Sequence, residues 1–237
     1  MRVGIFDSGI GGVNVLSSLI KKYPHNEYIY FGDTLNLPYG DKTKSELLLL
    51  ARNAINFLIS KKVEIVIIAC GTISSNCYEE LKKEYSIPLY DIISPTINYL
   101  KKLSLSKIGV IGTKRTIESK IFDLENKEIL MKETPSFVPI IENNLIIDKK
   151  DEIIDTLSCF KNYDLLVLGC THYPLLKEII EKVFSLKTLD MGEVLADVIN
   201  LSNNGRDLCE LYFSSMSVNL VLNIEKILSN KYQIYLK

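Results

Sequence analysis

Short, almost continuous apolar runs alternate with longer segments of helical period along the whole chain. Strands that are apolar throughout are typical of parallel sheets covered by helices on both faces. The alternation therefore predicts an α/β fold with parallel sheets. The predicted strands are 3–6, 28–31, 63–69, 107–111 and 165–168, and the predicted helices are 13–22, 45–60, 74–85, 147–160 and 174–184.

The chain of 237 residues is long enough for one large domain or two modest ones. Residues 85–95 contain two prolines and lead into a new helix, so we expect a change of domain there. We predict two doubly wound parallel-sheet domains that face each other across a cleft. The first comprises residues 1–95 plus 206–237, and the second comprises residues 96–205. The tail, 211–237, is too short for a domain and is expected to pack against the first one.

The composition, with 47% hydrophobic and 24% charged residues, is ordinary for a soluble globular protein. The formal net charge of −1 gives no excess charge that would attract nucleic acid or an anionic membrane. No apolar run approaches the roughly 18 residues that a membrane span needs. The first residues lack the charged and long apolar segments of a signal peptide. We therefore expect a cytoplasmic protein with no nucleic-acid or membrane partner.

Five cysteines occur, an odd number, and none forms a CxxC pair. Free thiols are therefore expected rather than a disulfide framework. Only two histidines are present, which gives little support to a zinc site, so no metal is expected. Three of the cysteines are interpreted as small buried apolar residues, namely Cys77, Cys159 and Cys209.

The remaining two cysteines lie in a loose internal repeat. Residues 64–72 read EIVIIACGT and residues 164–172 read DLLVLGCTH, so each apolar strand ends in a cysteine followed by a helix. The carboxyl ends of parallel strands form ligand sites, and a following helix N-terminus favours a thiolate. If the two halves face each other, Cys70 and Cys170 converge on one cleft and can exchange a proton on opposite faces of a carbon. The alternative is that they are two unrelated core cysteines.

A glycine-rich turn, Asp7–Gly12, connects the first strand to its helix. Free backbone N–H groups in such a turn can bind an anion. A dinucleotide fingerprint with Asp33 as the ribose acid fits poorly, because Asn14 stands where the third glycine is needed. No Lys-Ser/Thr pair follows, so a Walker A loop is also excluded. An amino acid fits better, with its ammonium on Asp7 and its carboxylate on Ser8 and the N–H groups; the alternative is a turn that needs glycine only for its shape.

Two further residues have both a structural and a functional interpretation. Tyr39, in the turn that precedes Gly40, is either a packing residue or a ligand contact. His172 lies two residues after Cys170 at a predicted helix start. It is either a surface histidine or a group that tunes or relays the proton of the neighbouring thiol.

The sequence contains five motifs, DSGIGG (7–12), FGDTLNLPYG (31–40), IIACGT (67–72), GTKRT (112–116) and GCTHYPLL (169–176). Together they resemble the glutamate racemases of the aspartate/glutamate racemase family. The family folds as two α/β domains and interconverts L- and D-glutamate without a cofactor by a two-base mechanism. Its product supplies peptidoglycan, and therefore cell-wall synthesis and cell shape. The resemblance also implies a homodimer.

The resemblance assigns roles to particular residues of this sequence. Cys70 and Cys170 correspond to the catalytic thiols, Asp7 and His172 to the residues that assist them, and Glu142 to a further acidic helper. Thr113 and Thr116 are additional candidates for substrate contacts. The substrate-binding residues implied by the motifs are Asp7, Ser8, Tyr39, Gly40, Gly71, Thr72, Thr171 and His172.

Gly71 departs from the family pattern, which has asparagine between the first cysteine and Thr72. Loss of the asparagine amide costs about 1–3 kcal/mol of binding free energy if the group it would contact stays without a hydrogen bond. Three outcomes are therefore open. They are a slower glutamate racemase, a racemase of aspartate or another amino acid, and a paralogue with a different role. The last includes a non-catalytic protein that binds an amino acid or regulates a partner.

Overall fold

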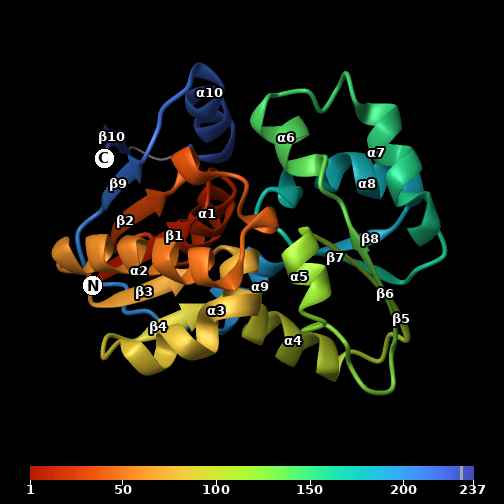
Figure 1. The fold of residues 1–237 in the computed structure, drawn as a ribbon, viewed down its shortest axis with the longest axis horizontal. Coiled ribbons are helices and arrows are strands. Elements are labelled where there is room, and N and C mark those ends of the chain that lie inside the picture. Colours follow the sequence, from red (N-terminus) through yellow and green to blue (C-terminus); the bar gives the residue numbers. More distant parts are fainter. Residues whose placement is uncertain (230–231) are drawn as a thin grey trace.

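The computed structural model describes residues 1–229 and 232–237 and contains two parallel sheets flanked by helices (Figure 1). This confirms the predicted fold class. The six-stranded sheet has the order β10 (Gln233–Leu236), β9 (Leu208–Phe213), β2 (Glu27–Gly32), β1 (Arg2–Asp7), β3 (Ile65–Ile68) and β4 (Leu89–Asp91). The four-stranded sheet has the order β6 (Glu128–Glu133), β5 (Lys107–Gly112), β7 (Leu165–Leu168) and β8 (Lys187–Asp190).

The two sheets share one topology. Strands β2-β1-β3-β4 of the first sheet correspond in order to β6-β5-β7-β8 of the second, and β9 and β10 extend the first sheet only. In each sheet the strand order reverses beside the central strand, at β1/β3 and at β5/β7. Ligand sites in open α/β sheets form at such reversals, outside the carboxyl ends of the strands. The repeat of 64–72 and 164–172 is therefore the repeat of β3 and β7.

Helices cover both faces of each sheet. Ile65 and Ile67 of β3 pack into a cluster with α1 and α9, whereas Val66 and Ile68 pack on the opposite face with α2 and α3. This alternation is what a strand buried on both faces requires. The helices are α1 (Gly12–Lys22), α2 (Lys44–Ser60), α3 (Gly71–Glu84), α4 (Ile93–Lys102), α5 (Lys114–Glu118), α6 (Phe137–Glu142), α7 (Lys150–Leu157), α8 (Lys177–Phe184), α9 (Met191–Val198) and α10 (Val218–Ile227).

One apolar cluster joins the two halves. It contains Val3 and Ile5 of β1, Ile108 and Val110 of β5, and residues of α1 and α9, and α9 packs against both α1 and α4. The division at residues 95/96 and 205/206 therefore stays a proposal. Strand β9 pairs with β2, so the tail packs on the first sheet. None of the helices described is long and apolar enough to cross a membrane.

The structure corrects several element bounds and one cysteine. The helix expected at 147–160 runs only from Lys150 to Leu157, and the one expected at 174–184 begins at Lys177 after a 3-10 turn. Five strands that the sequence did not indicate are present, namely β4, β6, β8, β9 and β10. Cys159, expected to be buried, is exposed, because it lies in the 3-10 turn after α7 rather than on an inward helix face.

We expect Cys159 to react with a thiol reagent in the native protein far faster than the buried Cys77 and Cys209, because accessibility controls thiol modification. Replacing Cys159 with serine should remove one rapidly modified thiol per chain, measured by reaction with Ellman's reagent. Cys77→Ser is the matched control and should leave the rapid count unchanged. A rapid count that is the same in Cys159→Ser and in the unmodified protein would contradict the exposed position.

Candidate active site

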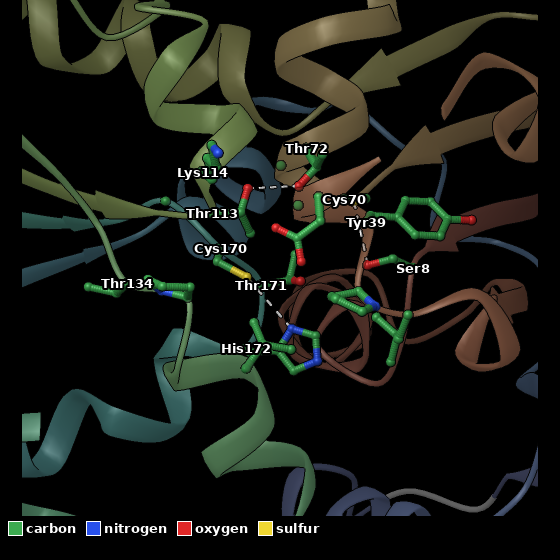
Figure 2. A pocket seen from close by; sticks show the side chains of 18 of the residues that line it. Ser8, Tyr39, Cys70, Thr72, Thr113, Lys114, Thr134, Cys170, Thr171 and His172 are labelled. Atoms are coloured by element: carbon green, nitrogen blue, oxygen red, sulfur yellow. Dashed lines mark hydrogen bonds between the residues drawn. The ribbon is translucent and has the colours of Figure 1, made fainter. Parts of the chain in front are cut away.

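Cys70 and Cys170 lie at the carboxyl ends of β3 and β7 and line one cavity of about 140 Å³ (Figure 2). Cys70 precedes the first residue of α3, and Cys170 precedes the 3-10 turn Tyr173–Leu176. The structure thus brings together the two cysteines that the repeat singled out. They approach the cavity from different sheets.

Most of the predicted site residues line this cavity. Three of the predicted residues are not in the lining, namely Asp7, Thr116 and Glu142. Among the described residues, no group of His, Cys, Asp or Glu side chains is arranged to hold a metal ion. The predicted residues in the lining are Ser8, Tyr39, Gly40, Cys70, Gly71, Thr72, Thr113, Cys170, Thr171 and His172. The lining residues that sequence reasoning missed are Leu37, Pro38, Asp41, Lys114, Thr134, Pro135, Val138, Pro139 and Gly169.

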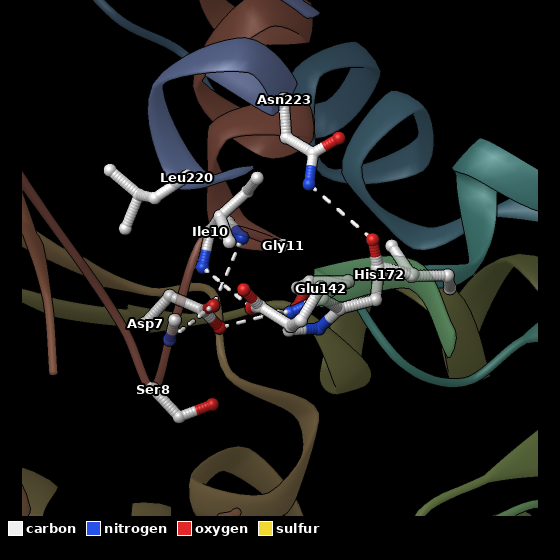
Figure 3. Close-up of polar contacts among 12 residues, drawn as sticks. Asp7, Ser8, Ile10, Gly11, Glu142, His172, Leu220 and Asn223 are labelled. Atoms are coloured by element: carbon white, nitrogen blue, oxygen red, sulfur yellow. Dashed lines mark hydrogen bonds and ion pairs between the residues drawn. The ribbon is translucent and has the colours of Figure 1, made fainter. Parts of the chain in front are cut away.

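The Asp7 carboxylate organises the glycine-rich turn (Figure 3). It is fully buried, and its Oδ2 accepts hydrogen bonds from the N–H groups of Gly9 at 3.1 Å and Gly12 at 3.0 Å. Its Oδ1 accepts one from the Thr171 hydroxyl at 3.2 Å. The Ile10 N–H donates to Glu142 Oε1 at 3.4 Å. These N–H groups, expected to receive a substrate carboxylate, are therefore already bound to carboxylates of the protein.

A buried histidine connects Cys170 to Glu142. His172 Nδ1 lies 3.6 Å from the Cys170 sulfur, and its Nε2 lies 2.6 Å from Glu142 Oε1. Burial lowers the pKa of His172, but the hydrogen bonds with Cys170 and Glu142 together raise that pKa well above its ordinary value. A protonated imidazole in this position places a positive charge next to the Cys170 sulfur.

Cys70 has a different environment. Its side chain is buried, and its sulfur donates to the Ser8 hydroxyl at 3.6 Å. Burial, followed by the nearby Asp7 charge, raises the pKa of Cys70 to about 12. The start of α3 was expected to favour a thiolate here, but the hydrogen bond from the Ile73 N–H does not offset the effect of burial. Cys70 is therefore a thiol at neutral pH.

The Tyr39 ring forms part of the cavity wall, while its hydroxyl points away from Cys70 (Figure 2). The hydroxyl donates to Asp33 Oδ2 at 2.6 Å, and Asp33 also accepts from the Ser214 hydroxyl at 2.8 Å. Asp33 is buried. It thus fixes the turn that carries Tyr39 to the segment that follows β9, and no ribose is needed to explain its position.

Hydroxyl groups link the two halves on the opposite side of the cavity. The Thr72 and Thr113 hydroxyls are 2.9 Å apart, and those of Thr113 and Thr116 are 3.0 Å apart. Among the described residues that line the cavity, Lys114 is the one lysine or arginine. These groups offer hydrogen-bond donors and a positive charge to an anionic ligand.

Comparison with known proteins agrees with this geometry. Residues 34–199 match the family model for Asp/Glu/hydantoin racemases. A glutamate racemase of Hydrogenobaculum is 37% identical, covering 99% of this chain and 95% of its own length. The chain belongs to the Asp/Glu racemase family.

Two solved structures of this family superpose on the whole chain. A glutamate racemase of Francisella tularensis in complex with D-glutamate has a TM-score of 0.86 at 30% identity, with 100% of this chain and 96% of that one covered. The glutamate racemase of Aquifex pyrophilus has a TM-score of 0.84 at 35% identity, with 100% and 98% covered. The two-sheet arrangement is therefore that of these racemases.

Gly71 allows a close approach between the two halves. A Cβ atom at this position would lie 2.9 Å from the carbonyl oxygen of Gly169, the residue before Cys170. That separation is shorter than side-chain carbons tolerate, and backbone atoms would have to move. The absence of the family's asparagine thus coincides with direct packing of the first turn of α3 against the loop that carries the second thiol.

We expect Gly71→Ala and Gly71→Asn to destabilise the protein. Alanine gains about 1 kcal/mol of helix propensity over glycine, but the contact with Gly169 costs about 1–3 kcal/mol as overpacking. The Tm should fall by a few degrees, and activity should fall with it because Gly169 adjoins Cys170. Glu79→Ala, at an exposed position of the same helix, is the control. A higher Tm in Gly71→Ala, raised by the full gain in helix propensity, would show that the close approach costs nothing.

Proposed function

We propose that the protein is a glutamate racemase, a cofactor-independent isomerase that interconverts L- and D-glutamate. The observation that carries the proposal is the placement of Cys70 and Cys170 at equivalent strand ends around one cavity. The curated relatives named glutamate racemase, which match over nearly the full chain, support the choice of substrate.

The reaction needs one thiolate and one thiol on opposite faces of the substrate. The thiolate removes the α-proton, which leaves a carbanion delocalised into the α-carboxylate. The thiol then donates its proton to the other face, so the product has the opposite hand and the two sulfurs have exchanged protonation states. For the reverse direction the two roles are exchanged, and no net oxidation or proton uptake occurs.

The environments of the two sulfurs support different starting states. Burial keeps Cys70 protonated, so it is the proton donor. Cys170 lies beside His172, whose raised pKa supplies a positive charge, so it is the base. We assign Glu142 the role of holding the His172 imidazole. Asp7 shapes the turn that places Ser8 against the Cys70 sulfur.

Substrate contacts follow from the cavity lining. We propose that Ser8, Thr72 and Thr171 bind the polar groups of the amino acid, with the walls supplied by Tyr39 and Gly40. His172 also lines the cavity, and its imidazole contacts the Cys170 sulfur that exchanges a proton with the substrate. The main chain at Gly71 contributes the first N–H of α3. Asp7 reaches the substrate only through the turn and Thr171, because it is not in the cavity lining.

We further propose that the product supplies D-glutamate for peptidoglycan and that the enzyme is a cytoplasmic homodimer. The small-molecule substrate is supported by the D-glutamate in the Francisella structure. Sedimentation of the purified protein tests the dimer.

Replacing either thiol should abolish racemisation. Cys70→Ala and Cys170→Ala each remove one proton carrier, and the loss in kcat should be at least about 100- to 10,000-fold, as for other acid/base groups. D-Glutamate formed from L-glutamate is measured by circular dichroism, and α-proton exchange is followed in D2O. Cys77→Ala, a buried cysteine on α3 outside the cavity, is the matched control.

The single-thiol variants distinguish a racemase from a binding protein. In Cys70→Ala, exchange of the α-proton should persist in only one enantiomer, because Cys170 remains as the base. Full activity in either alanine variant would contradict the two-thiol mechanism. If the unmodified protein exchanges the α-proton of no amino acid in a panel that includes glutamate and aspartate, it is not a racemase.

A further inference from the structure

We propose that α10 is a clasp that positions Glu142, and through it His172, from the opposite half of the molecule. The inference deepens the proposed function, since the residues it concerns act on the Cys170 side of the site. Asn223 and Lys226 of α10 hold the end of α6, the helix that terminates in Glu142. Figure 3 shows Asn223 and Glu142. Neither Asn223 nor Lys226 lines the cavity, so both are positioning residues.

Helix α10 is anchored to the first sheet. It follows β9, which pairs with β2, and it packs against α1 (Figure 1). Leu220 and Ile224 are buried in the central apolar cluster. The Ser17 hydroxyl of α1 donates to the Ile227 carbonyl at 3.3 Å. The inner face of α10 is therefore fixed relative to β1 and the turn that carries Asp7.

The other contacts of α10 reach the end of α6, which follows β6 of the second sheet. Asn223 Nδ2 donates to the Ile141 carbonyl at 3.4 Å, and Lys226 Nζ donates to Asn144 Oδ1 at 2.8 Å. Asn144 has a positive φ of 58° and its N–H donates to Ile141, while the Leu145 N–H donates back to the Ile140 carbonyl. This is the Schellman arrangement that ends helices. Both α10 side chains thus bind the cap of α6.

Glu142, which lies next to this cap, contacts His172, and His172 contacts the Cys170 sulfur. Glu142 is the last residue of α6, directly after Ile141, and its Oε1 lies 2.6 Å from His172 Nε2. A small rotation of the α6 end would lengthen this contact and change the orientation of the imidazole beside Cys170. Geometry of this kind affects rate strongly, since a shift of about 1 Å can cost about 100-fold.

The chemistry of Asn223 supports a specific role. It is 3% exposed and lies between buried Leu220 and Ile224, where an apolar residue would pack without any need for a partner. A buried amide is costly unless it is hydrogen-bonded. The Ile141 carbonyl supplies that bond, which joins the two halves at this point together with the contact between Lys226 and Asn144.

The test uses two variants. Asn223→Leu keeps the side-chain volume at a buried position and removes the hydrogen-bond donor. Lys226→Met changes an exposed side chain, so it leaves the packing of the core unchanged. Glu225→Gln, exposed on the same helix, is the control. His172 is one of only two histidines, so its pKa can be followed by NMR with His25 as an internal reference. Cys170 and Glu142 contact the His172 ring, and Asp7 approaches it through Thr171.

We expect Asn223→Leu to lower the pKa of His172 and to reduce kcat by about 10-fold with KM within about twofold. Lys226→Met should act in the same direction, and Glu225→Gln should change neither quantity. In a Glu142→Gln background, Asn223→Leu should have no further effect on either, because its path runs through Glu142.

Three results would overturn the proposal. Asn223→Leu could reduce kcat equally with and without the Glu142→Gln change, or it could reduce kcat while the pKa of His172 stays unchanged. The third result is that neither α10 variant has any effect. The titration of His172 does not depend on turnover. If the unmodified protein proves inactive, the proposed function fails while the titration still decides whether α10 positions Glu142.

Discussion

The two halves of the molecule meet where the turn after β1 lies directly against the loop after β7. Gly11 has no side chain because Thr171 and His172 fill the space: a Cβ there would lie 2.5 Å from His172 Nδ1. Asn14 donates to the Thr171 carbonyl at 2.9 Å and to the Gly11 carbonyl at 3.1 Å. Glycine at this turn therefore serves the approach of two peptide segments, and the two thiols face one cavity because that approach is possible.

Gly71 and Gly169 make a second close contact between the two halves, on the other side of the cavity. Each half contributes a glycine at the point of closest approach, so backbone lies against backbone near both sulfurs. An asparagine at position 71 would have to be accommodated by moving the halves apart. Gly71 is then explained by a tighter junction of the same site, and it gives no reason to choose a different substrate class.

The sequence predicts features that depend on neighbouring residues better than features that depend on contacts between distant residues. Strands β1, β3, β5 and β7 are apolar runs buried on both faces, and the cysteines that follow β3 and β7 were found from that local signal. Strand β6 is half-exposed and charged at its ends, and β4 has three residues after a proline, so neither carries such a run. Asn223 could not be found, because its partner is a main-chain carbonyl 82 residues away.

The same distinction applies to the surroundings of the two sulfurs. Sequence position placed both cysteines at strand ends ahead of helical turns and predicted similar thiolates. The structure gives the two sulfurs unlike surroundings. Burial and the Asp7 charge raise the pKa of Cys70, whereas Cys170 contacts a histidine held by Glu142. A racemase works in both directions, so each sulfur must both donate and accept the proton in these different surroundings.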